Sequence, residues 1–208
     1  MKKFGNVLIL GDSYSTFDQY IPDGYGAYYG EWTSKVNKVE KTWWHMLIGE
    51  TASKLVTNES FSGTTVCNTG YDNHYCPDTS FVGRFLKYAD ENGMDGIDTV
   101  FIFGGTNDCW AGSPLGTIKY EGISDEDLKS FLPAFSYLIA KIREKAPEAE
   151  IVDLINCDLS EGITKGQQEI CSHYKVHCIT LENIDKEDGH PTDVGMIQIK
   201  DAILAYFK

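Results

Sequence analysis

The sequence predicts an α/β fold in which helices cover both faces of a parallel sheet of about five strands. Short apolar runs alternate with amphipathic segments along the whole chain, and polar, glycine-bearing stretches follow several of the apolar runs. This alternation is typical of repeated strand–helix–strand units, whose strands lie parallel. A length of 208 residues fits one domain of ordinary size, so we expect a single domain over residues 1–208.

The first half of the chain predicts two strands and two helices. The run NVLIL is apolar throughout and ends at a glycine, as a buried strand of a parallel sheet does. A serine or threonine before an apolar periodic segment marks a helix start, because its hydroxyl accepts hydrogen bonds from the first N–H groups. In order, the expected elements are a strand over Asn6–Leu10, a helix over Trp43–Ala52, a strand over Lys54–Thr57, and a helix that Thr79 or Ser80 caps and that runs to about Ala89.

The second half predicts three strands and three helices. Ser124 followed by Asp127 resembles a capping box and predicts the start of a long helix, with apolar residues at helical spacing as far as Ile142. Pro133 would lie in its first turns. In order, the expected elements are a strand over Asp98–Phe103, that long helix, a strand over Glu150–Ile155, a helix over Thr164–Tyr174, a strand over Val176–Thr180 and an amphipathic helix over Val194–Phe207.

The composition excludes several classes of protein. Asp and Glu outnumber Lys and Arg by 31 to 18, and the net charge of −13 disfavours nucleic acid or an anionic membrane surface as a partner. No apolar run approaches the roughly 18 residues of a membrane span, and Val7–Leu10 is too short for an export segment. We therefore expect the chain as given to be cytoplasmic, although a removed export signal would leave no trace. The six cysteines form no Cys-x-x-Cys pair, so we expect no disulfide framework and leave their redox state open.

Four polar, glycine-bearing clusters stand where a parallel sheet places its ligand site. Ligands of such sheets bind beyond the carboxyl ends of the strands. Three of the clusters follow predicted strands and the fourth precedes the last helix, so we expect them to line one cleft. They are Gly11-Asp12-Ser13, Asn58-Glu59-Ser60-Phe61-Ser62-Gly63, Gly104-Gly105-Thr106-Asn107-Asp108 and Asp188-Gly189-His190-Pro191-Thr192.

These clusters contain the groups that acyl transfer requires. A serine hydroxyl is a weak nucleophile and needs a base within hydrogen-bond reach, and His190 can serve Ser13 in this way. A nearby carboxylate would orient the imidazole and stabilise its charged form. The oxyanion that forms on attack needs preorganised donors. The backbone N–H groups of Ser13 and Gly63 and the side-chain amide of Asn107 are suited to that task.

In this order, the clusters resemble the SGNH (GDSL-type) hydrolase family. The resemblance extends from GDS near the amino end, through a glycine after the second strand and GGTND after the third, to GHP before the last helix. It implies a flavodoxin-like three-layer α/β/α sandwich and the hydrolysis of esters or thioesters without a metal or other cofactor. It also implies that Ser13 is the nucleophile, that His190 is the base, and that Ser13, Gly63 and Asn107 form the oxyanion hole.

The chain departs from the family pattern at two places. Tyr14 stands where the longer family signature has Leu. The family usually has an Asp three residues before the His, and this chain has Glu187 there. Asp188 is the first candidate for orienting His190, Asp185 and Glu187 follow, and a backbone carbonyl, which would leave a dyad, is the fourth.

Two other groups of residues stand out. The segment Tyr14–Trp44 is rich in Tyr, Trp and Gly, and it predicts either a cover over the nucleophile or a contact between copies of the chain in a homo-oligomer. Cys171, His173, His177 and Cys178 are residue types that bind metals. No second ligand pair accompanies them in the sequence, so we expect no metal.

The residues and the resemblance together predict a serine esterase that acts on small esters through an acyl-enzyme. The polar and aromatic loops, and analogy with the family, favour short acyl groups such as acetyl groups on a carbohydrate. A non-catalytic carbohydrate-binding or scaffold protein on the same fold is the alternative from another class, and a lipase or thioesterase is the alternative within the family. The expected partner is a small ester, with an acylated sugar as the first candidate.

Overall fold

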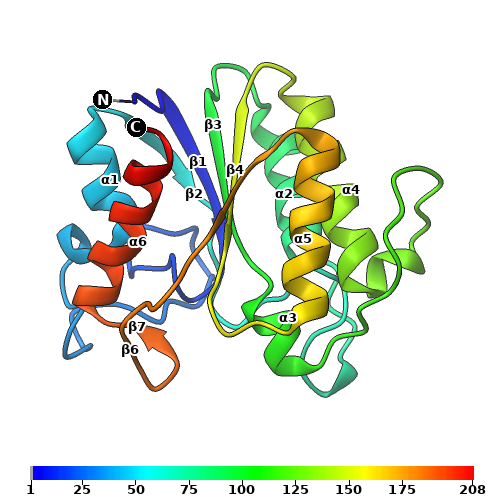
Figure 1. Ribbon diagram of the computed structural model, residues 1–208, viewed down its shortest axis with the longest axis horizontal. Coiled ribbons are helices and arrows are strands. Elements are labelled where there is room, and N and C mark those ends of the chain that lie inside the picture. Colours follow the sequence, from blue (N-terminus) through cyan, green and yellow to red (C-terminus); the bar gives the residue numbers. More distant parts are fainter. Residues whose placement is uncertain (1) are drawn as a thin grey trace.

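The computed structural model describes residues 2–208 and contains a five-stranded parallel sheet (Figure 1). Its strands lie in the order β2-β1-β3-β4-β5, and every neighbouring pair is parallel. This is the order of flavodoxin-like doubly wound sheets, so the predicted α/β class is confirmed. The strands are β1 (Asn6–Gly11), β2 (Lys54–Asn58), β3 (Thr99–Phe103), β4 (Glu150–Ile155) and β5 (His177–Thr180).

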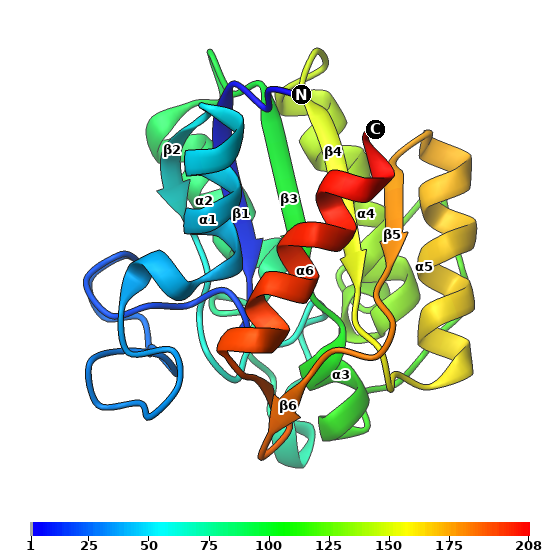
Figure 2. The same ribbon diagram turned by 60° about the vertical axis from the view of Figure 1, so that its left-hand side comes forward.

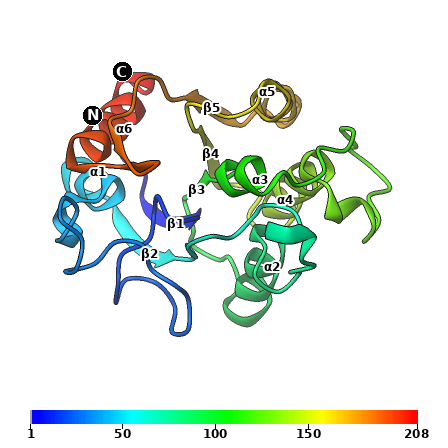
Figure 3. The ribbon, with the colours of Figure 1, turned by 90° about the horizontal axis from the view of Figure 1, so that it is seen from below.

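Helices cover both faces of this sheet and complete three layers (Figures 1 and 3). α1 and α6 lie together on one face, and α2, α4 and α5 lie on the other. The helices are α1 (Trp43–Thr51), α2 (Phe81–Asn92), α3 (Thr106–Ala111), α4 (Phe131–Lys145), α5 (Glu161–Tyr174) and α6 (Asp193–Tyr206), with single 3-10 turns at Val39–Lys41, Tyr71–Asn73 and Asp127–Lys129. None of the helices within residues 2–208 is long and apolar enough to cross a membrane.

β1 and β3 are almost entirely apolar because both of their faces are covered. Successive side chains of a strand point to opposite faces of the sheet. In β1, Leu8 and Leu10 pack in the core formed with α2, α4 and α5, whereas Val7 and Ile9 pack in the core formed with α1 and α6. The continuous apolar runs that predicted these strands therefore result from burial on two sides.

The loops that follow the strands gather at one edge of the sheet, the lower edge in Figure 1, which faces the reader in Figure 3. The connections from β1 and β3 leave in different directions, because β2 pairs with one side of β1 and β3 with the other. A doubly wound sheet opens its ligand crevice at such a switch point. Ser13 lies in the turn after β1 and Asn107 lies on α3, which follows β3, so both residues lie at this switch point.

A small antiparallel hairpin, absent from the predicted elements, lies at the same edge (Figure 2). It consists of β6 (Lys186–Glu187) and β7 (His190–Pro191). Its two turn residues, Asp188 and Gly189, have φ angles of 49° and 78°. A type I′ turn requires positive φ at both positions, and Asp-Gly is one of the dipeptides that best adopt it. The hairpin thereby holds His190 at the carboxyl edge of the sheet.

The prediction that Ser124 opens the long helix is wrong. Ser124 and Asp127 do exchange the hydrogen bonds of a capping box, but these bonds close only the turn that leads into the 3-10 segment Asp127–Lys129. α4 begins after this turn, at Phe131. Pro133 explains the difference, because a proline ring clashes with the carbonyl four residues earlier unless it lies in the first turn of a helix.

The other predicted elements agree with the structure to within about three residues. Ser80, one of the two predicted caps, accepts a hydrogen bond from Gly83 N at the start of α2. α5 begins earlier than predicted because Ser160 caps it. The short helix α3 was not predicted, and its N-cap, Gly105, has a left-handed backbone and provides no capping side chain.

Candidate active site

Ser13 and His190 come from opposite ends of the chain and meet at the carboxyl edge of the sheet. His190 Nε2 lies 3.0 Å from Ser13 Oγ. Ser13 is only 3% exposed, and His190 is half-buried. A hydroxyl and an imidazole at this distance form the contact that a serine nucleophile and its base require.

A tight turn after β1 fixes Ser13. The Asp12 carboxylate accepts a hydrogen bond from Tyr14 N at 3.0 Å, and the Asp12 carbonyl accepts one from Ser15 N at 3.0 Å. The Thr16 hydroxyl donates to the Ser13 carbonyl at 3.1 Å. Aspartate side chains often stabilise turns in this way by bonding to the backbone two residues on. Ser13 therefore occupies a turn and does not cap a helix.

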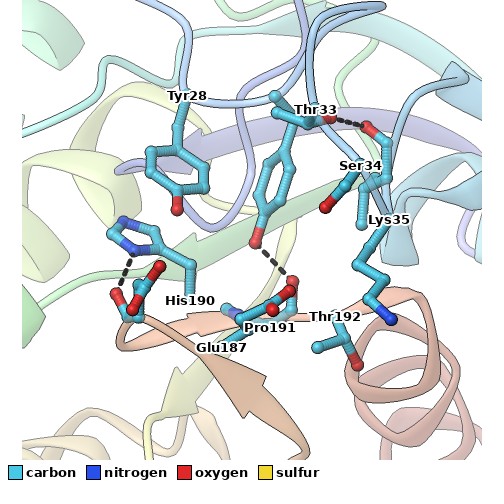
Figure 4. A pocket seen from close by; sticks show the side chains of 11 residues that line it. Tyr28, Thr33, Ser34, Lys35, Glu187, His190, Pro191 and Thr192 are labelled. Atoms are coloured by element: carbon cyan, nitrogen blue, oxygen red, sulfur yellow. Dashed lines mark hydrogen bonds between the residues drawn. The ribbon is translucent and has the colours of Figure 1, made fainter.

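The second ring nitrogen of His190 contacts the backbone. His190 Nδ1 lies 3.1 Å from the carbonyl oxygen of Asp188 (Figure 4). The Asp185 carboxylate instead accepts a hydrogen bond from Thr192, the N-cap of α6, and Glu187 is exposed on the hairpin. No carboxylate among residues 2–208 is hydrogen-bonded to the ring. The structure thus differs from the first expectation, because the type I′ turn brings the Asp188 carbonyl, and not its exposed carboxylate, to Nδ1.

This contact determines which nitrogen carries the proton. A carbonyl can only accept a hydrogen bond, so Nδ1 of His190 donates to Asp188, and Nε2 of the neutral ring is left to accept a hydrogen bond from the Ser13 hydroxyl. Burial lowers the pKa of His190, and the charge of Lys186 lowers it further, whereas the hydrogen bond and charge of Asp188 oppose both effects. The lowered pKa favours the neutral form of the His190 ring at neutral pH.

Asn107, on α3, contacts the turn that carries Ser13, and its buried amide is fixed by two hydrogen bonds. Its side-chain carbonyl accepts a hydrogen bond from the Tyr71 hydroxyl at 2.8 Å, and its Nδ2 donates to Asp12 Oδ2 at 3.3 Å. A side-chain amide has two N–H donors, so one of them remains for a ligand. In the described part of the chain, neither the N–H of Ser13 nor that of Gly63 donates a hydrogen bond. The N–H groups of Ser13 and Gly63 and one of the two amide N–H groups of Asn107 are thus without an acceptor among residues 2–208.

Gly63 lies in the exposed loop after β2 and has a φ of 77°. A positive φ favours glycine, which has no Cβ to clash with the backbone. The loop runs beside the end of β1, where Phe61 N donates to the Gly11 carbonyl at 3.1 Å. Gly63 follows two residues later and so belongs to the loop that borders the Ser13 turn.

A fully buried arginine on α2 ties these loops together. Arg84 Nη2 donates to the Gly11 carbonyl at 3.1 Å and to the Thr64 hydroxyl at 3.0 Å. Its Nη1 donates to the Glu59 carbonyl, and its Nε donates to the Thr79 carbonyl at 3.0 Å. Burial lowers the pKa of Arg84 to about 10, which still leaves it charged at neutral pH. Its planar fork of donors suits this set of acceptors better than the single ammonium of a lysine would.

Replacing Arg84 with methionine should lower the free energy of unfolding by about 2 kcal/mol or more, because the Glu59 and Thr79 carbonyls lose their donor and each such loss costs about 1–3 kcal/mol. Urea denaturation measures this change. The matched control is Arg143→Met, which removes two donors from the half-buried Arg143 side chain and should cost about 1 kcal/mol. Equal losses in the two variants would show that Arg84 does not stabilise the loops.

Two buried carboxyl groups flank the site. Burial raises the pKa of Asp12 to about 7 and the pKa of Asp108 to about 6. Asp108 accepts hydrogen bonds from Val66 N at 2.8 Å and Cys67 N at 3.1 Å, which ties the 66–67 backbone to α3. Both groups therefore brace loops with their oxygens.

Part of the aromatic segment Tyr14–Trp44 packs on the hairpin. The Tyr28 ring stacks on His190, with ring centres 3.6 Å apart and ring planes 8° from parallel. The Tyr29 hydroxyl donates to the Pro191 carbonyl at 2.6 Å (Figure 4). A cavity of about 280 Å³ lies between residues 28–36 and the hairpin and reaches the His190 ring. This segment therefore contributes directly to the surroundings of the imidazole.

A family model described as GDSL-like lipase/acylhydrolase matches residues 5–207. The chain belongs to this family. Crystal structures of two proteins assigned as GDSL-like lipases resemble it over nearly their whole lengths. The first, from Bacteroides ovatus, is 44% identical, has a TM-score of 0.92 and covers 99% of each chain. The second, from Bacteroides uniformis, is 42% identical, has a TM-score of 0.89 and covers 97% of this chain and 94% of its own.

More distant structures share the fold of this GDSL-like chain. The acetyl xylan esterase Est2A from Butyrivibrio proteoclasticus is 17% identical, has a TM-score of 0.61, and matches 100% of this chain over 64% of its own length. A family two carbohydrate esterase from Clostridium thermocellum is 15% identical, has a TM-score of 0.64, and matches 100% of this chain over 64% of its own length. No curated protein matches the chain.

One group outside the GDSL-like site has metal-ligand residue types. Ligand atoms of Asp153, Cys171 and Cys178 lie within 4.8 Å of one another, on β4, α5 and β5. Burial raises the pKa of Asp153 well above its usual value, and Asp153 lies 3.6 Å from the Cys171 thiol. The Cys171 thiol donates to this carboxyl, so a hydrogen bond accounts for the contact between the two. His173 and His177 point to other partners and stack on Tyr120 and against Phe207 respectively.

Sequence reasoning singled out none of four residues at the GDSL-like site, although one of them, Tyr28, lies in the Tyr14–Trp44 segment that predicted a cover or a contact between copies. Trp110 lies three residues after Asn107 on α3, and its ring centre is 5.7 Å from that of His190. Residues three apart on a helix lie on the same face, so the spacing of Trp110 from Asn107 could have placed it near the site. Arg84 was also detectable, because it interrupts an otherwise apolar helix face between Phe81 and Phe85. Tyr28 and Tyr71 had no signal beyond the aromatic richness of their segments.

Proposed function

We propose that this GDSL-family chain is a serine esterase in which Ser13 attacks the ester carbonyl and His190 accepts its proton. The observation that carries the proposal is the 3.0 Å contact between Ser13 Oγ and His190 Nε2. The attack forms a bond from Oγ to the acyl carbon, and the Oγ proton passes to Nε2. The imidazolium then donates that proton to the leaving alcohol, and the acyl-enzyme remains. Water repeats the sequence and releases the acid.

The negative charge that develops on the carbonyl oxygen needs donors placed in advance. The N–H groups of Ser13 and Gly63 and the remaining N–H of Asn107 supply them in this proposal. The carbonyl of Asp188 keeps Nδ1 protonated and stabilises the charged ring through its dipole. The site works as a Ser–His dyad with a backbone acceptor, which was the fourth alternative that the sequence left open.

The preferred substrate class is a short acyl ester, such as an acetyl ester of a carbohydrate. Exposed aromatic rings border the site: Trp110 is 47% exposed beside His190, and Tyr71 is 42% exposed and donates to Asn107. Aromatic faces with polar edges suit sugar rings better than long aliphatic chains. The distant structures whose names include acetyl xylan and carbohydrate esterase support the same class by analogy.

The proposal is tested by covalent labelling and by substrate choice. A fluorophosphonate should label Ser13 between pH 6 and 9, and the Ser13→Ala variant should not be labelled. Acetylated sugars and aryl esters of rising acyl length should show the highest kcat/KM for acetyl. No labelling would favour the non-catalytic carbohydrate-binding protein, and a preference for long acyl chains would favour the lipase or thioesterase alternative.

The activity should follow the titration of His190. The base must be neutral to accept a proton, and burial lowers its pKa below the ordinary 6.5. We expect kcat/KM to be constant at alkaline pH and to fall as the pH drops through a midpoint below 6.5. A pH series of kcat/KM measures this midpoint. The pKa of the neighbouring Asp12 is about 7, so the same series on Asp12→Asn separates the titration of that carboxyl from the titration of His190. A midpoint above 6.5 in both proteins would contradict the expectation.

A further inference from the structure

The base sits on a small and exposed element that cannot fix it alone. The hairpin consists of two strands of two residues each, and such a ribbon has little stability by itself. His190 also lacks a carboxylate partner in the described residues. The orientation of the imidazole toward Ser13 must therefore depend on groups outside the hairpin.

Tyr28 is the first of these groups. Its ring covers one face of the imidazole, with centroids 3.6 Å apart (Figure 4). The Tyr28 N–H donates at 2.9 Å to the Thr16 hydroxyl, which itself donates to the Ser13 carbonyl. One threonine thus connects the stacked ring to the turn that carries the serine. No residue among 2–208 is hydrogen-bonded to the Tyr28 hydroxyl. Tyr28 therefore contacts His190 through its ring and not through its hydroxyl.

Tyr14 is the second group, and it acts through its hydroxyl. It is fully buried and directly follows Ser13 in the sequence. Its hydroxyl donates to the carbonyl of Gly189, the residue before His190, at 2.5 Å. Asn156 Nδ2 donates to the same hydroxyl at 3.3 Å, and Lys186 Nζ holds Asn156 Oδ1 at 2.9 Å. The turn of the hairpin is thereby tied to the turn of the serine.

We propose that Tyr14 and Tyr28, the tyrosine pair, are positioning residues that hold His190 against Ser13 in place of an orienting carboxylate. Tyr28 does so through its ring and Tyr14 through its hydroxyl. The proposal rests on the serine esterase function argued above. It also accounts for the departure from the family signature at position 14, where leucine could not make the bond to Gly189.

Tyr28 also keeps water from the imidazole. The groups that face His190 are Ser13, Tyr14 and Tyr28 from the amino-terminal segment, Trp110 from α3, and Lys186 and Asp188 from the hairpin. Burial is the main cause of the lowered pKa of His190. A cavity of about 280 Å³ adjoins both rings, so removing the Tyr28 ring would open the imidazole to it. The pKa of His190 should then rise toward its ordinary value.

The test compares ring and hydroxyl at each position, using kcat, KM and the pH profile of aryl acetate hydrolysis. Tyr28→Ala should lower kcat on the order of 10- to 100-fold with little change in KM, because small misplacements of a catalytic group cost that much. Its acid limb should move to higher pH. Tyr28→Phe, which keeps the ring, should retain most of the native kcat and the native position of the acid limb of the pH profile. Tyr14→Phe, by contrast, should lose about 10-fold in kcat while its acid limb stays in place.

The opposite responses of the two phenylalanine variants distinguish positioning from general damage. Tyr206→Ala, at the far end of α6, is the control for removal of an exposed tyrosine and should leave kcat unchanged. Fluorophosphonate labelling of Ser13 should slow in parallel with kcat, and urea midpoints establish that each variant is folded. Tyr28→Leu replaces the alanine variant if that variant unfolds.

Each result has one consequence. One outcome is that the native protein is active and that Tyr28 variants which fold but lack the ring keep its kcat and its acid limb. This outcome would refute the positioning role of the tyrosine pair and leave the serine esterase proposal intact. A loss in Tyr28→Phe as large as in the alanine or leucine variant would also refute the assigned role of the ring. Full activity in Tyr14→Phe would refute the role of its hydroxyl. An unlabelled and inactive native protein would instead refute the proposed function itself.

Discussion

Replacing Ser13 with alanine should lower kcat for an aryl acetate by several orders of magnitude, on the order of 10⁴- to 10⁶-fold. The Ser13 hydroxyl is the atom that would bond to the acyl carbon, and neither water nor His190 can replace it at the same position. The remaining rate would come from binding and from the oxyanion donors alone. Steady-state kinetics with active-site titration of the native protein measures the change.

A second serine of the same turn provides the matched control. Ser15 is also buried, and its hydroxyl accepts a hydrogen bond from Trp43 Nε1 at 3.2 Å. Ser15→Ala should destabilise the protein by about 1 kcal/mol and keep activity within about tenfold of the native value. If Ser13→Ala kept more than a tenth of the native kcat, as Ser15→Ala is expected to do, Ser13 would be excluded as the nucleophile.

The sheet could be predicted because its strands carry strong local signals. VFIF and EIVDLI are rich in the apolar and β-branched residues that burial on both faces favours, and β3 and β4 lie where these runs do, with Asp153 as a buried polar exception in β4. The prediction of where α4 begins was wrong because two local signals conflicted. The capping box of Ser124 favoured an early start, but the steric demand of Pro133 allowed only a later one.

The hairpin illustrates a signal that was present and not used. Asp188-Gly189 is a characteristic type I′ dipeptide, and its turn decides which group reaches His190 Nδ1. A search for a carboxylate at a fixed sequence distance could not find the answer, because the backbone of Asp188 makes the contact. The identity of an orienting atom depends on turn geometry, whereas the sequence pattern specifies only residue types.

The meeting of Ser13 and His190 was predictable for a topological reason. Both follow or flank elements whose ends lie at the carboxyl edge of a parallel sheet, so their separation in sequence does not matter. The supporting contacts of Arg84 and Tyr28 depend instead on how α2 and the aromatic segment pack, which no local pattern determines. Tertiary packing therefore supplies the part of the site that sequence reasoning missed.

Replacing Asn107 with alanine should lower kcat on the order of 10²- to 10³-fold with a smaller effect on KM, since its amide would bind the oxygen chiefly after charge has developed on it. Asp12 and Tyr71 hold the amide in place from two sides. Tyr71→Phe removes one of these contacts and should cost much less, because the bond to Asp12 remains.

Asn107→Asp provides the sharper comparison, because it keeps the shape of the side chain and removes the donor. It also places a second carboxyl beside Asp12, whose pKa is already raised to about 7 by burial. If the amide stabilises the oxyanion, this variant should be at least as impaired as Asn107→Ala above pH 7, where an ionised carboxylate would repel the developing charge. Steady-state kinetics of both variants at pH 6 and pH 8 measures the difference, and near-native kcat in either one would mean that Asn107 only braces the loop after β3.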